Sequence, residues 1–329
     1  MPGRALAALS SRRADEAASC TPARAKCRWF QRGKAVTFKI LFLGIGKIGL
    51  PMARHLQAGG HTVLAHDVDA ERMRLGQAKG LSLAQSPDVA LAKADVVVSS
   101  LPHDAALLDV AAWLGQKGGR GQIWIDTSTV SLASSERAAL SMQQAGLGHL
   151  RVTISGNNHM AHAAELTVLA SGPQDLYERM KPLLQCWGPQ QFYLGQGEQA
   201  RMMKLVINLM IAQTSAMLAE ALNLGQRGGL EWRKMWEVIG ASAVGSPIVK
   251  AKSVQLSAHD YTPTFTVHQM LKDVGLMLQA GAELHMPLPQ LSLTEQLMHQ
   301  AIAQGDGELD YAAIIRAMTR ACGQIPPEK

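Results

Sequence analysis

Residues 39–67 read KILFLGIGKIGLPMARHLQAGGHTVLAHD. An apolar run at 40–43 enters a turn with three glycines, and apolar residues then recur at helical spacing until a Gly-Gly pair. A second strand-like run at 62–65 ends near Asp67, about 20 positions beyond the glycines. The stretch therefore predicts a strand, a glycine turn, a helix and a second strand followed by an acidic residue.

This order of elements is typical of a dinucleotide-binding turn, whereas the glycine pattern alone would be a weak signal. Gly44 permits the tight turn, Gly46 lets the backbone approach a pyrophosphate, and Gly49 lets the helix pack closely on the strand. The unpaired N–H groups at the start of the helix then face the phosphates. We expect a cofactor site formed by Gly44, Ile45, Gly46, Lys47, Ile48 and Gly49.

Asp67 bears on which dinucleotide binds. Its carboxylate can accept hydrogen bonds from both ribose hydroxyls, and its charge would repel a 2′-phosphate. The sequence therefore favours NAD as the cofactor, with NADP as the other possibility.

Length and charge limit the classes of partner. The chain has 329 residues, enough for about two domains. Its net charge of +6 comes from residues 1–35, which hold eight Lys or Arg and two acids, while the remainder carries 24 of each sign. A neutral body gives no general reason to expect nucleic acid or membrane as a partner. Four cysteines show neither a disulfide framework nor a metal-ligand spacing, which suits a reducing compartment.

Residues 1–36 form a basic tail rich in Ala, Arg and Ser. One interpretation is a mitochondrial transit peptide. The other is a start codon placed too early, with the real protein beginning near Val36. The second is favoured because the tail lacks a clear apolar face and the first strand follows within a few residues. We therefore expect a cytoplasmic protein, with the mitochondrial matrix as the alternative.

Helix and strand signals alternate through residues 37–194, which predicts a Rossmann-type doubly wound α/β domain. The β-branched run at 95–101 and the run at 122–126 are typical of buried parallel strands. Further strands are expected at 150–154, 166–171 and 191–194. Ligands of such sheets bind beyond the carboxyl ends of the strands.

Two polar segments follow these strands and leave alternatives open. Ser128 and Thr129 can contribute to a ligand site, but residues of this type also cap helices. The segment SGNNHMAHAAE at 155–165 offers backbone amides to an anion at its Gly-containing turn. Its His159 and His162 have no further metal-ligand types arranged around them, so we expect a polar loop and no metal.

From residue 195 the pattern becomes helical, which predicts an all-helical substrate and oligomerisation domain over 195–329. Residues 199–227 are apolar on nearly every turn, but they include Lys204 and Asn208. We therefore expect a buried interdomain helix rather than a membrane span, which needs about 20 predominantly apolar residues. Further helices are expected at 232–239, 246–256, 268–282, 291–305 and 311–318.

Lys204 is the informative residue of this helix. Lysine is rarely buried without a partner or a task, and Lys204 shares a helix face with Asn208. Desolvation lowers the pKa of a lysine toward values useful for proton transfer. The alternatives are a side chain that reaches the surface or pairs with an acid such as Glu198. By itself, the later Lys272-Asp273 dipeptide is typical of an exposed surface pair.

Taken together, these segments resemble the β-hydroxyacid dehydrogenase family, which includes 3-hydroxyisobutyrate dehydrogenases and glyoxylate/succinic semialdehyde reductases. The resemblance covers roughly residues 38–318 and rests on an ordered set of motifs, which are LGIGKIGLPMA, SSLP, DTSTVS, SGN, KLVIN, DYTPTF, LKD and GDGELDYAA. It implies hydride transfer between NAD(P) and a small 3-hydroxy acid or the matching semialdehyde. It also implies a homodimer or homotetramer.

The resemblance further implies residue roles, with Lys204 as the catalytic general acid/base. The implied substrate-binding residues are Ser128, Ser155, Gly156, Asn208 and Phe265. The implied cofactor-binding residues, beyond the glycine turn and Asp67, are Leu101, Pro102, Thr129 and Lys272.

Departures from the family pattern lie in the 155–165 segment. Asn157, Met160 and Ala164 replace glycines of the family, and bulkier side chains there could reshape the pocket for a substrate carboxylate. An inactive cofactor-binding homologue is therefore kept as an alternative, and an imine reductase-like enzyme, a related use of the fold, is a further one. The intact Lys204 and Asn208 argue against the inactive homologue. The presence of Lys204 also disfavours an imine reductase, because imine reductases usually replace this lysine.

Overall fold

The structure is a computed structural model that describes residues 36–327. Apart from Val36, the basic tail expected over residues 1–36 lies outside the described residues, so neither interpretation of it is tested.

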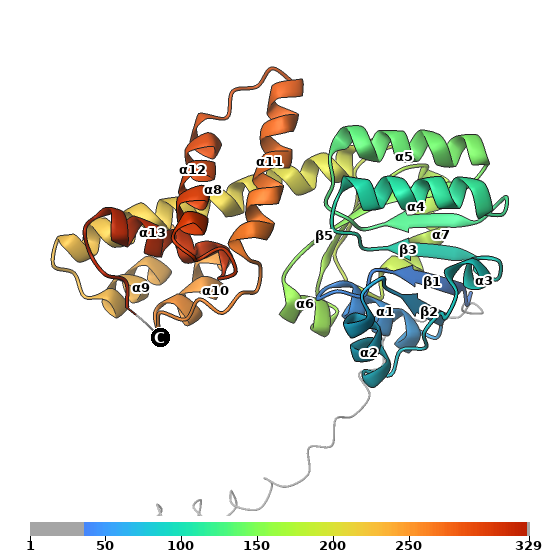
Figure 1. Ribbon diagram of the computed structural model, residues 1–329, viewed down its shortest axis with the longest axis horizontal. Coiled ribbons are helices and arrows are strands. Elements are labelled where there is room, and N and C mark those ends of the chain that lie inside the picture. The colour runs from blue at the N-terminus through green and yellow to red at the C-terminus, as the bar shows by residue number, and fades with distance from the viewer. Residues whose placement is uncertain (1–35, 328–329) are drawn as a thin grey trace, which may run out of the picture. The chain divides into compact units, whose positions relative to one another are not determined.

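A seven-stranded sheet forms the first part of the described chain, in the order β2-β1-β3-β4-β5-β6-β7 (Figure 1). Its strands are β1 (Lys39–Leu43), β2 (Thr62–His66), β3 (Val96–Ser99), β4 (Ile123–Asp126), β5 (Gly148–Ser155), β6 (Thr167–Ser171) and β7 (Gln191–Tyr193). The helices between them are α1 (Gly49–Ala58), α2 (Ala70–Ala78), α3 (Pro87–Leu91), α4 (Asp104–Lys117), α5 (Leu132–Ala145), α6 (Asn158–Ala163) and α7 (Gln174–Leu184).

Strand direction and register bring three loops to one edge of the sheet. Strands β1 to β5 are mutually parallel, whereas β6 runs antiparallel to β5 and β7 runs parallel to β6. Leu43 pairs with Ser99, and Ser99 pairs with Asp126, so β1, β3 and β4 end at the same level. The glycine turn and the loops after Ser99 and Asp126 therefore lie side by side, where such sheets bind ligands.

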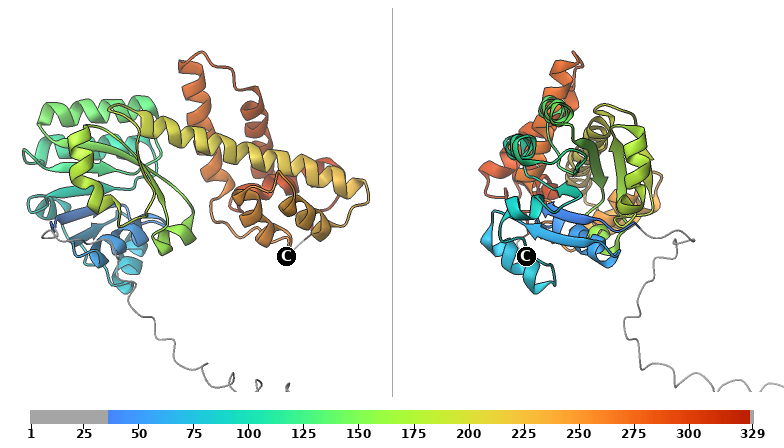
Figure 2. Two further views of the ribbon diagram at one scale, coloured as in Figure 1. Left: turned by 180° about the vertical axis from the view of Figure 1, so that it is seen from behind. Right: turned by 90° about the vertical axis from the view of Figure 1, so that its right-hand side faces the viewer.

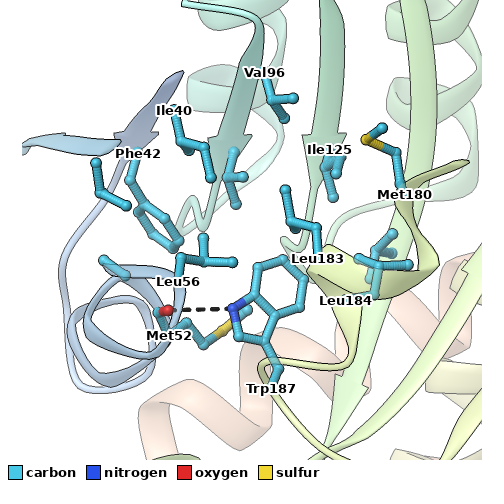
Figure 3. Close-up of a cluster of buried hydrophobic side chains, with 14 of the residues drawn as sticks. Ile40, Phe42, Met52, Leu56, Val96, Ile125, Met180, Leu183, Leu184 and Trp187 are labelled. Carbon is cyan, nitrogen blue, oxygen red and sulfur yellow. Dashed lines mark hydrogen bonds between the residues drawn. The ribbon is translucent and has the colours of Figure 1, made fainter. Parts of the chain in front are cut away.

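Alternate residues of the strands enter two separate cores, one on each face of the sheet. One face packs against α1 and α7, and Trp187 donates a hydrogen bond from Nε1 to the Met52 carbonyl at 3.2 Å (Figure 3). The other face packs against α3, α4 and α5 around the fully buried Trp124. Helices cover both faces, as expected for a doubly wound domain.

Helices form the second part of the described chain, and the long α8 (Gln199–Arg227) connects it to the sheet (Figures 1 and 2). Near its start α8 contacts β5 and β6, and it also packs against helices of the second part, α11 among them. The remaining elements are α9 (Trp232–Ala241), α10 (Pro247–Leu256), α11 (Val267–Glu283), α12 (Pro289–Ala303), the 3₁₀ turn η1 (Tyr311–Ala313) and α13 (Ile314–Ala321). The predicted fold class, a Rossmann-type domain followed by an all-helical domain, is confirmed.

Helix α8 is long and apolar enough to cross a membrane by length and composition, but core helices of soluble proteins meet the same criteria. Residues at its start bond to strands of the sheet. Thr153 of β5 donates to the Ala200 carbonyl at 2.9 Å, and Arg201 forms an ion pair with Asp126. These contacts fit the expected interdomain helix.

Candidate functional site

The glycine turn has the geometry expected of a phosphate-binding loop. Gly44 has φ +88°, and a Cβ there would lie 2.3 Å from the Ser100 carbonyl oxygen. A Cβ on Gly49 would lie 2.0 Å from the Gly44 oxygen, so both positions need glycine for the fold itself. A Cβ on Gly46, in contrast, would meet no protein atom within 4 Å. The space beside Gly46 is therefore free for a pyrophosphate.

The start of α1 also leaves backbone donors for an anion. Its N-cap is Ile48, which provides no side-chain hydrogen bond, and its first turn contains no acidic residue. The following helices α2 to α5 are all capped, by Asp69, Ser86, His103 and Ser131. Lys47 is exposed in the same turn and adds positive charge. The residues present thus fit the pyrophosphate of a dinucleotide.

Asp67 lies directly after β2 and is already held by the backbone. Its Oδ2 accepts the Ile45 N–H at 2.9 Å, and its Oδ1 accepts the Asp69 N–H at 3.0 Å. The Arg72 guanidinium is 3.6 Å from Asp67 Oδ2 and half-exposed. The carboxylate is therefore fixed against the glycine turn, with an arginine close enough to meet a negative group on a ribose.

The loop after β4 is built around Asp126, which is completely buried. Asp126 Oδ1 accepts hydrogen bonds from Ser99 Oγ at 2.5 Å and from Ser128 Oγ at 2.6 Å. Ser128 Oγ in turn accepts the Leu101 N–H at 2.8 Å. Holding a substrate carboxylate would require the single proton of the Ser128 hydroxyl to leave Asp126. In this arrangement Ser128 ties the loop after β3 to the loop after β4.

Four polar side chains of the second part lie together, and one of them, Lys272, contacts this loop. Asn208 Nδ2 donates to Asp273 Oδ2 at 2.7 Å, and both residues are buried. Lys272 Nζ donates to the Thr129 carbonyl at 2.7 Å and lies 2.8 Å from Asp273 Oδ1. Lys204 lies one turn before Asn208 on α8 and is half-buried. Helices α8 and α11 therefore carry a cluster of two ammonium groups, one carboxylate and one amide, which Lys272 joins to the loop after β4.

The pKa of Lys204 is lowered from its ordinary value of 10.5, chiefly because burial disfavours the charged ammonium. The Asp273 carboxylate opposes this shift, and the Lys272 ammonium adds to it. Lys204 makes no hydrogen bond or ion pair with residues 36–327. Its amine is therefore available to accept or donate a proton.

The altered segment after β5 forms a helix rather than the expected loop. Ser155 ends β5, Gly156 follows with φ +143°, and the Asn157 side chain caps α6 by accepting the Met160 N–H at 3.0 Å. The Met160 side chain packs against Gly156 and the core beneath it. The partly buried Met160 side chain therefore packs against the core, and the helix explains how this chain tolerates it in place of a glycine.

Two further predicted residues, Phe265 for the substrate and Pro102 for the cofactor, lie at separate positions. Phe265 is half-buried in the helical core, where its ring meets Tyr311 edge-on at 6.5 Å. Pro102 is exposed at the start of the loop after β3. Among residues 36–327 no group of three or more His, Cys, Asp or Glu side chains could hold a metal ion.

Three polar residues of this region were missed by sequence reasoning, and two of them had a signal. Asp273 lies on the same helical stripe as the buried Met270 and Met277, where a surface acid is not expected. Arg201 interrupts an apolar run one turn before Lys204. Asp126 ends a buried strand, a common place for a polar residue, so nothing distinguished it.

Comparisons with known proteins agree with this geometry. Residues 39–195 match a family model described as the NAD binding domain of 6-phosphogluconate dehydrogenase, and residues 196–318 match one described as NAD-binding of NADP-dependent 3-hydroxyisobutyrate dehydrogenase. A 2-(hydroxymethyl)glutarate dehydrogenase of Eubacterium barkeri is 30% identical over 294 residues, which cover 87% of this chain and 97% of the relative. The chain belongs to the β-hydroxyacid dehydrogenase family.

Two further relatives illustrate the range of this β-hydroxyacid dehydrogenase family. Glyoxylate/succinic semialdehyde reductase 2 of Arabidopsis thaliana is 28% identical, over 88% of this chain and 82% of the relative. The solved structure titled 3-hydroxyisobutyrate dehydrogenase with L-serine, of Mycobacterium tuberculosis, matches with a TM-score of 0.78 at 25% identity, over 85% of this chain and 98% of that one. As a member of the β-hydroxyacid dehydrogenase family, the protein is an NAD(P)-binding oxidoreductase.

Proposed function

We propose that the protein interconverts a small 3-hydroxy acid and the matching semialdehyde, with Lys204 as the general acid/base. The observation that carries this proposal is the half-buried Lys204 amine, whose pKa is lowered and which makes no hydrogen bond or ion pair within residues 36–327. NAD(P), when bound, supplies the hydride acceptor or donor. The dinucleotide turn and the cluster on α8 and α11 supply the binding and proton-transfer groups that this reaction requires.

In the proposed reaction Lys204 transfers the proton, Asn208 contacts the substrate and Lys272 holds the loop beside the cofactor. During oxidation the neutral Lys204 amine accepts the proton of the substrate hydroxyl as the C–H bond loses its hydride; during reduction the ammonium returns that proton to the carbonyl oxygen. Asn208 is held by Asp273, which leaves its amide oxygen fixed for a contact with the substrate. Lys272 holds the Thr129 carbonyl and thereby the loop beside the cofactor.

The substrate class follows from chemistry that the named relatives share. Their substrates combine a carboxylate with an alcohol or aldehyde on a short carbon chain. In this chain Ser155 and the Gly156 amide at the end of β5 are proposed to receive the carboxylate, because that segment runs beside the start of α8. For the cofactor we propose NAD over NADP, because Asp67 is fixed beside the turn, although Arg72 lies near it.

A substrate panel tests the proposal directly. Purified protein is assayed with NAD+ and NADP+ against 3-hydroxyisobutyrate, 2-(hydroxymethyl)glutarate and L-serine, and with NADH and NADPH against glyoxylate and succinic semialdehyde. We expect turnover of at least one compound and a preference for NAD(H). Folded protein that turns over no compound while binding NADH would contradict the proposal and favour the inactive homologue.

Lys204→Ala tests the role of the amine. We expect turnover to fall by about 10²- to 10⁴-fold, the usual contribution of a general acid/base, while NADH binding by fluorescence titration stays within about threefold of wild type. Lys250→Ala, on the exposed surface of α10, is the matched control and should change neither quantity. Retained turnover in Lys204→Ala would exclude the amine as the proton carrier.

We also propose that the protein forms a homo-oligomer through α8. Exposed apolar side chains recur on this helix at every seventh residue, at Met203, Met210, Met217 and Leu224. Seven residues are close to two helical turns, so these side chains form one stripe along the helix. The same apolar stripe on a second copy of the chain can pack against this one and remove both from water.

A further inference from the structure

Arg201 is the largest polar side chain among the fully buried residues, with 1% of its surface exposed. Its Nη2 donates to Asp126 Oδ2, its Nη1 donates to the Ser128 carbonyl, and its Nε donates to Ser135 Oγ at 3.1 Å. These three acceptors belong to the end of β4, the loop after it and α5. One guanidinium therefore joins the start of α8 to three separate parts of the sheet domain.

The contacts of Arg201 extend to the loop after β3. The Asp126 carboxylate that it holds also accepts the hydroxyls of Ser99 and Ser128. Ser128 Oγ accepts the Leu101 N–H, so the chain of bonds runs from Arg201 through Asp126 and Ser128 to Leu101. Both loops that carry the expected cofactor-binding residues Leu101, Pro102 and Thr129 are thus connected to a single residue of α8.

Arg201 and Lys204 are one turn apart on the same helix. Residues separated by three positions share a helix face and differ in height by about 4.5 Å. Lys272 of α11 holds the next carbonyl of the loop, that of Thr129, from the second part of the chain. The loop at 127–131 is therefore hydrogen-bonded by Arg201 of α8 and by Lys272 of α11. Arg201 belongs to the same turn of α8 as Lys204, the proposed proton carrier.

We propose that Arg201 is a positioning residue that fixes the distance between the Lys204 amine and the loops at 101–102 and 128–129. The inference rests on the proposed function of Lys204. The hydride leaves the carbinol carbon of the substrate, and the proton leaves the oxygen bonded to that carbon. The loops beside the cofactor and the Lys204 amine must therefore stay at a fixed distance from each other. A displacement of about 1 Å between reacting groups can lower a rate by about 10²-fold.

The planar guanidinium is what suits Arg201 to this task. It presents donors in a fixed fork and can bond a carboxylate, a carbonyl and a hydroxyl at once. A lysine at this position would still place a positive charge near Asp126, but as a point charge it could not hold all three acceptors. Arg201→Lys therefore separates neutralisation of Asp126 from positioning of the loop.

The experiment compares Arg201→Lys with Arg151→Lys in the full-length protein. Arg151 forms an ion pair with Glu198 at 2.7 Å and also joins the sheet to the start of α8, but it does not contact the loop at 127–131. For Arg201→Lys we expect kcat to fall by about 10- to 100-fold with KM and the NADH dissociation constant within about threefold of wild type. We also expect faster amide hydrogen exchange in peptides covering 100–102 and 127–131. Arg151→Lys should leave kcat and that exchange unchanged.

Each other outcome decides the inference. Unchanged kcat in folded Arg201→Lys, or an equal loss in the two variants, would overturn it. If Arg201→Lys does not fold, Ser135→Ala removes only the Nε contact, and unchanged kcat and loop exchange in that variant would overturn it. If the wild type turns over no substrate, the proposed function fails. In that case amide hydrogen exchange of the two loops is measured in the NADH-bound protein. Equal exchange in Arg201→Lys and wild type would exclude the positioning role of Arg201.

Discussion

The charge of a single ammonium group is set by its neighbours in this protein. Burial lowers the pKa of Lys204, Lys272 lowers it further, and Asp273 raises it. The two neighbours are adjacent on α11, so one helix carries both opposing influences. In the proposed reaction, the pH dependence therefore depends on residues that do not themselves exchange the proton.

These opposing influences predict the pH dependence of the reaction. Oxidation needs the neutral amine, so kcat/KM should rise with pH and level off above the pKa of Lys204, which lies below 10.5. Reduction needs the ammonium, so kcat/KM should fall through the same pH. Because Asp273 raises this pKa, Asp273→Asn should move both midpoints to lower pH. Lys272→Gln should move them to higher pH, and shifts of the same sign in the two variants would contradict this account.

His149 is a second titratable residue whose neighbours fix its charge. It is buried, its ring stacks on Trp124 at 4.6 Å, and neither ring nitrogen has a hydrogen-bond partner among the described residues. Burial lowers its pKa well below 6.5, and the charges of Arg151 and Arg201 add to this shift. The folded protein therefore contains a neutral imidazole on β5.

The buried imidazole predicts a loss of stability in acid. Below pH 6.5 the unfolded chain binds a proton on His149 that the folded protein does not, so the free energy of unfolding should fall by about 1.4 kcal/mol per pH unit from this residue. His149→Phe keeps the stacked ring and removes the titration. In urea unfolding at about pH 7.5 and pH 5.5, the variant should lose less stability than the wild type. Equal losses would show that His149 is also protonated in the folded state.

For single residues, the sequence indicated which side chains are candidates for function but not which residues they contact. Lys204 and Asn208 were recognisable because they interrupt an apolar helix. The hydrogen-bond partner of Asn208 could not be predicted, because Asp273 is 65 positions away in the chain. The hydrogen bonds of Ser128 depend on Asp126 and Leu101 together, and no local pattern predicts such a set.

Helix α6 shows how an element can replace a glycine-rich segment. Asn157 caps its start, and Ala164 ends it in the left-handed conformation with φ 56°. A residue with a Cβ is strained there, and glycine is the usual choice at such a helix end. The element is therefore held by its contacts, among them His55 Nε2 at 2.9 Å from the Ala161 carbonyl.

This strain predicts a stabilising substitution. Ala164→Gly should raise the free energy of unfolding by about 0.5 to 1 kcal/mol, because relief of the strain exceeds the added freedom of the unfolded chain. Ala163→Gly, one position earlier and inside the helix, should instead lower it by about 1 kcal/mol. Denaturant unfolding of both variants measures the two effects. A loss in both would mean that the end of α6 is not strained.

The strands and long helices were predictable because each has a periodic pattern of its own. The two helices that were missed, α3 and α6, have five and six residues and are too short to show one. The antiparallel direction of β6 was also unforeseen. Strand direction depends on how the connection crosses the sheet, and the residues of β6 have the same β-branched, buried character as their parallel neighbours.

The molecule as a whole presents one long apolar stripe on α8. Met210 is 65% exposed and Leu224 is 76% exposed, although Leu205, Ala212 and Leu218 of the same helix are buried in the core of the second part. The two-domain order was predictable, since the sequence pattern changes from alternating to purely helical. The number of copies was not, because it depends on a surface that the isolated chain leaves uncovered.

The stripe predicts how the assembly can be broken. Met210→Glu places a charge at its centre and should reduce the mass measured by light scattering to that of a smaller species. Val89→Glu, a similarly exposed apolar position on α3, should leave the mass unchanged. Unchanged mass in Met210→Glu would place the oligomer interface elsewhere or show that the wild type is monomeric.

The continuous path of α8 restricts how this chain can change over time. The helix begins beside β5 and continues without a break past Lys204, so no hinge lies between its contact with the sheet and the Lys204 amine. Inserting or deleting one residue between Arg201 and Lys204 would rotate the amine by about 100° around the helix axis. Length variation among descendants of this gene is therefore expected in the turns between helices, while the spacing inside this turn stays constant.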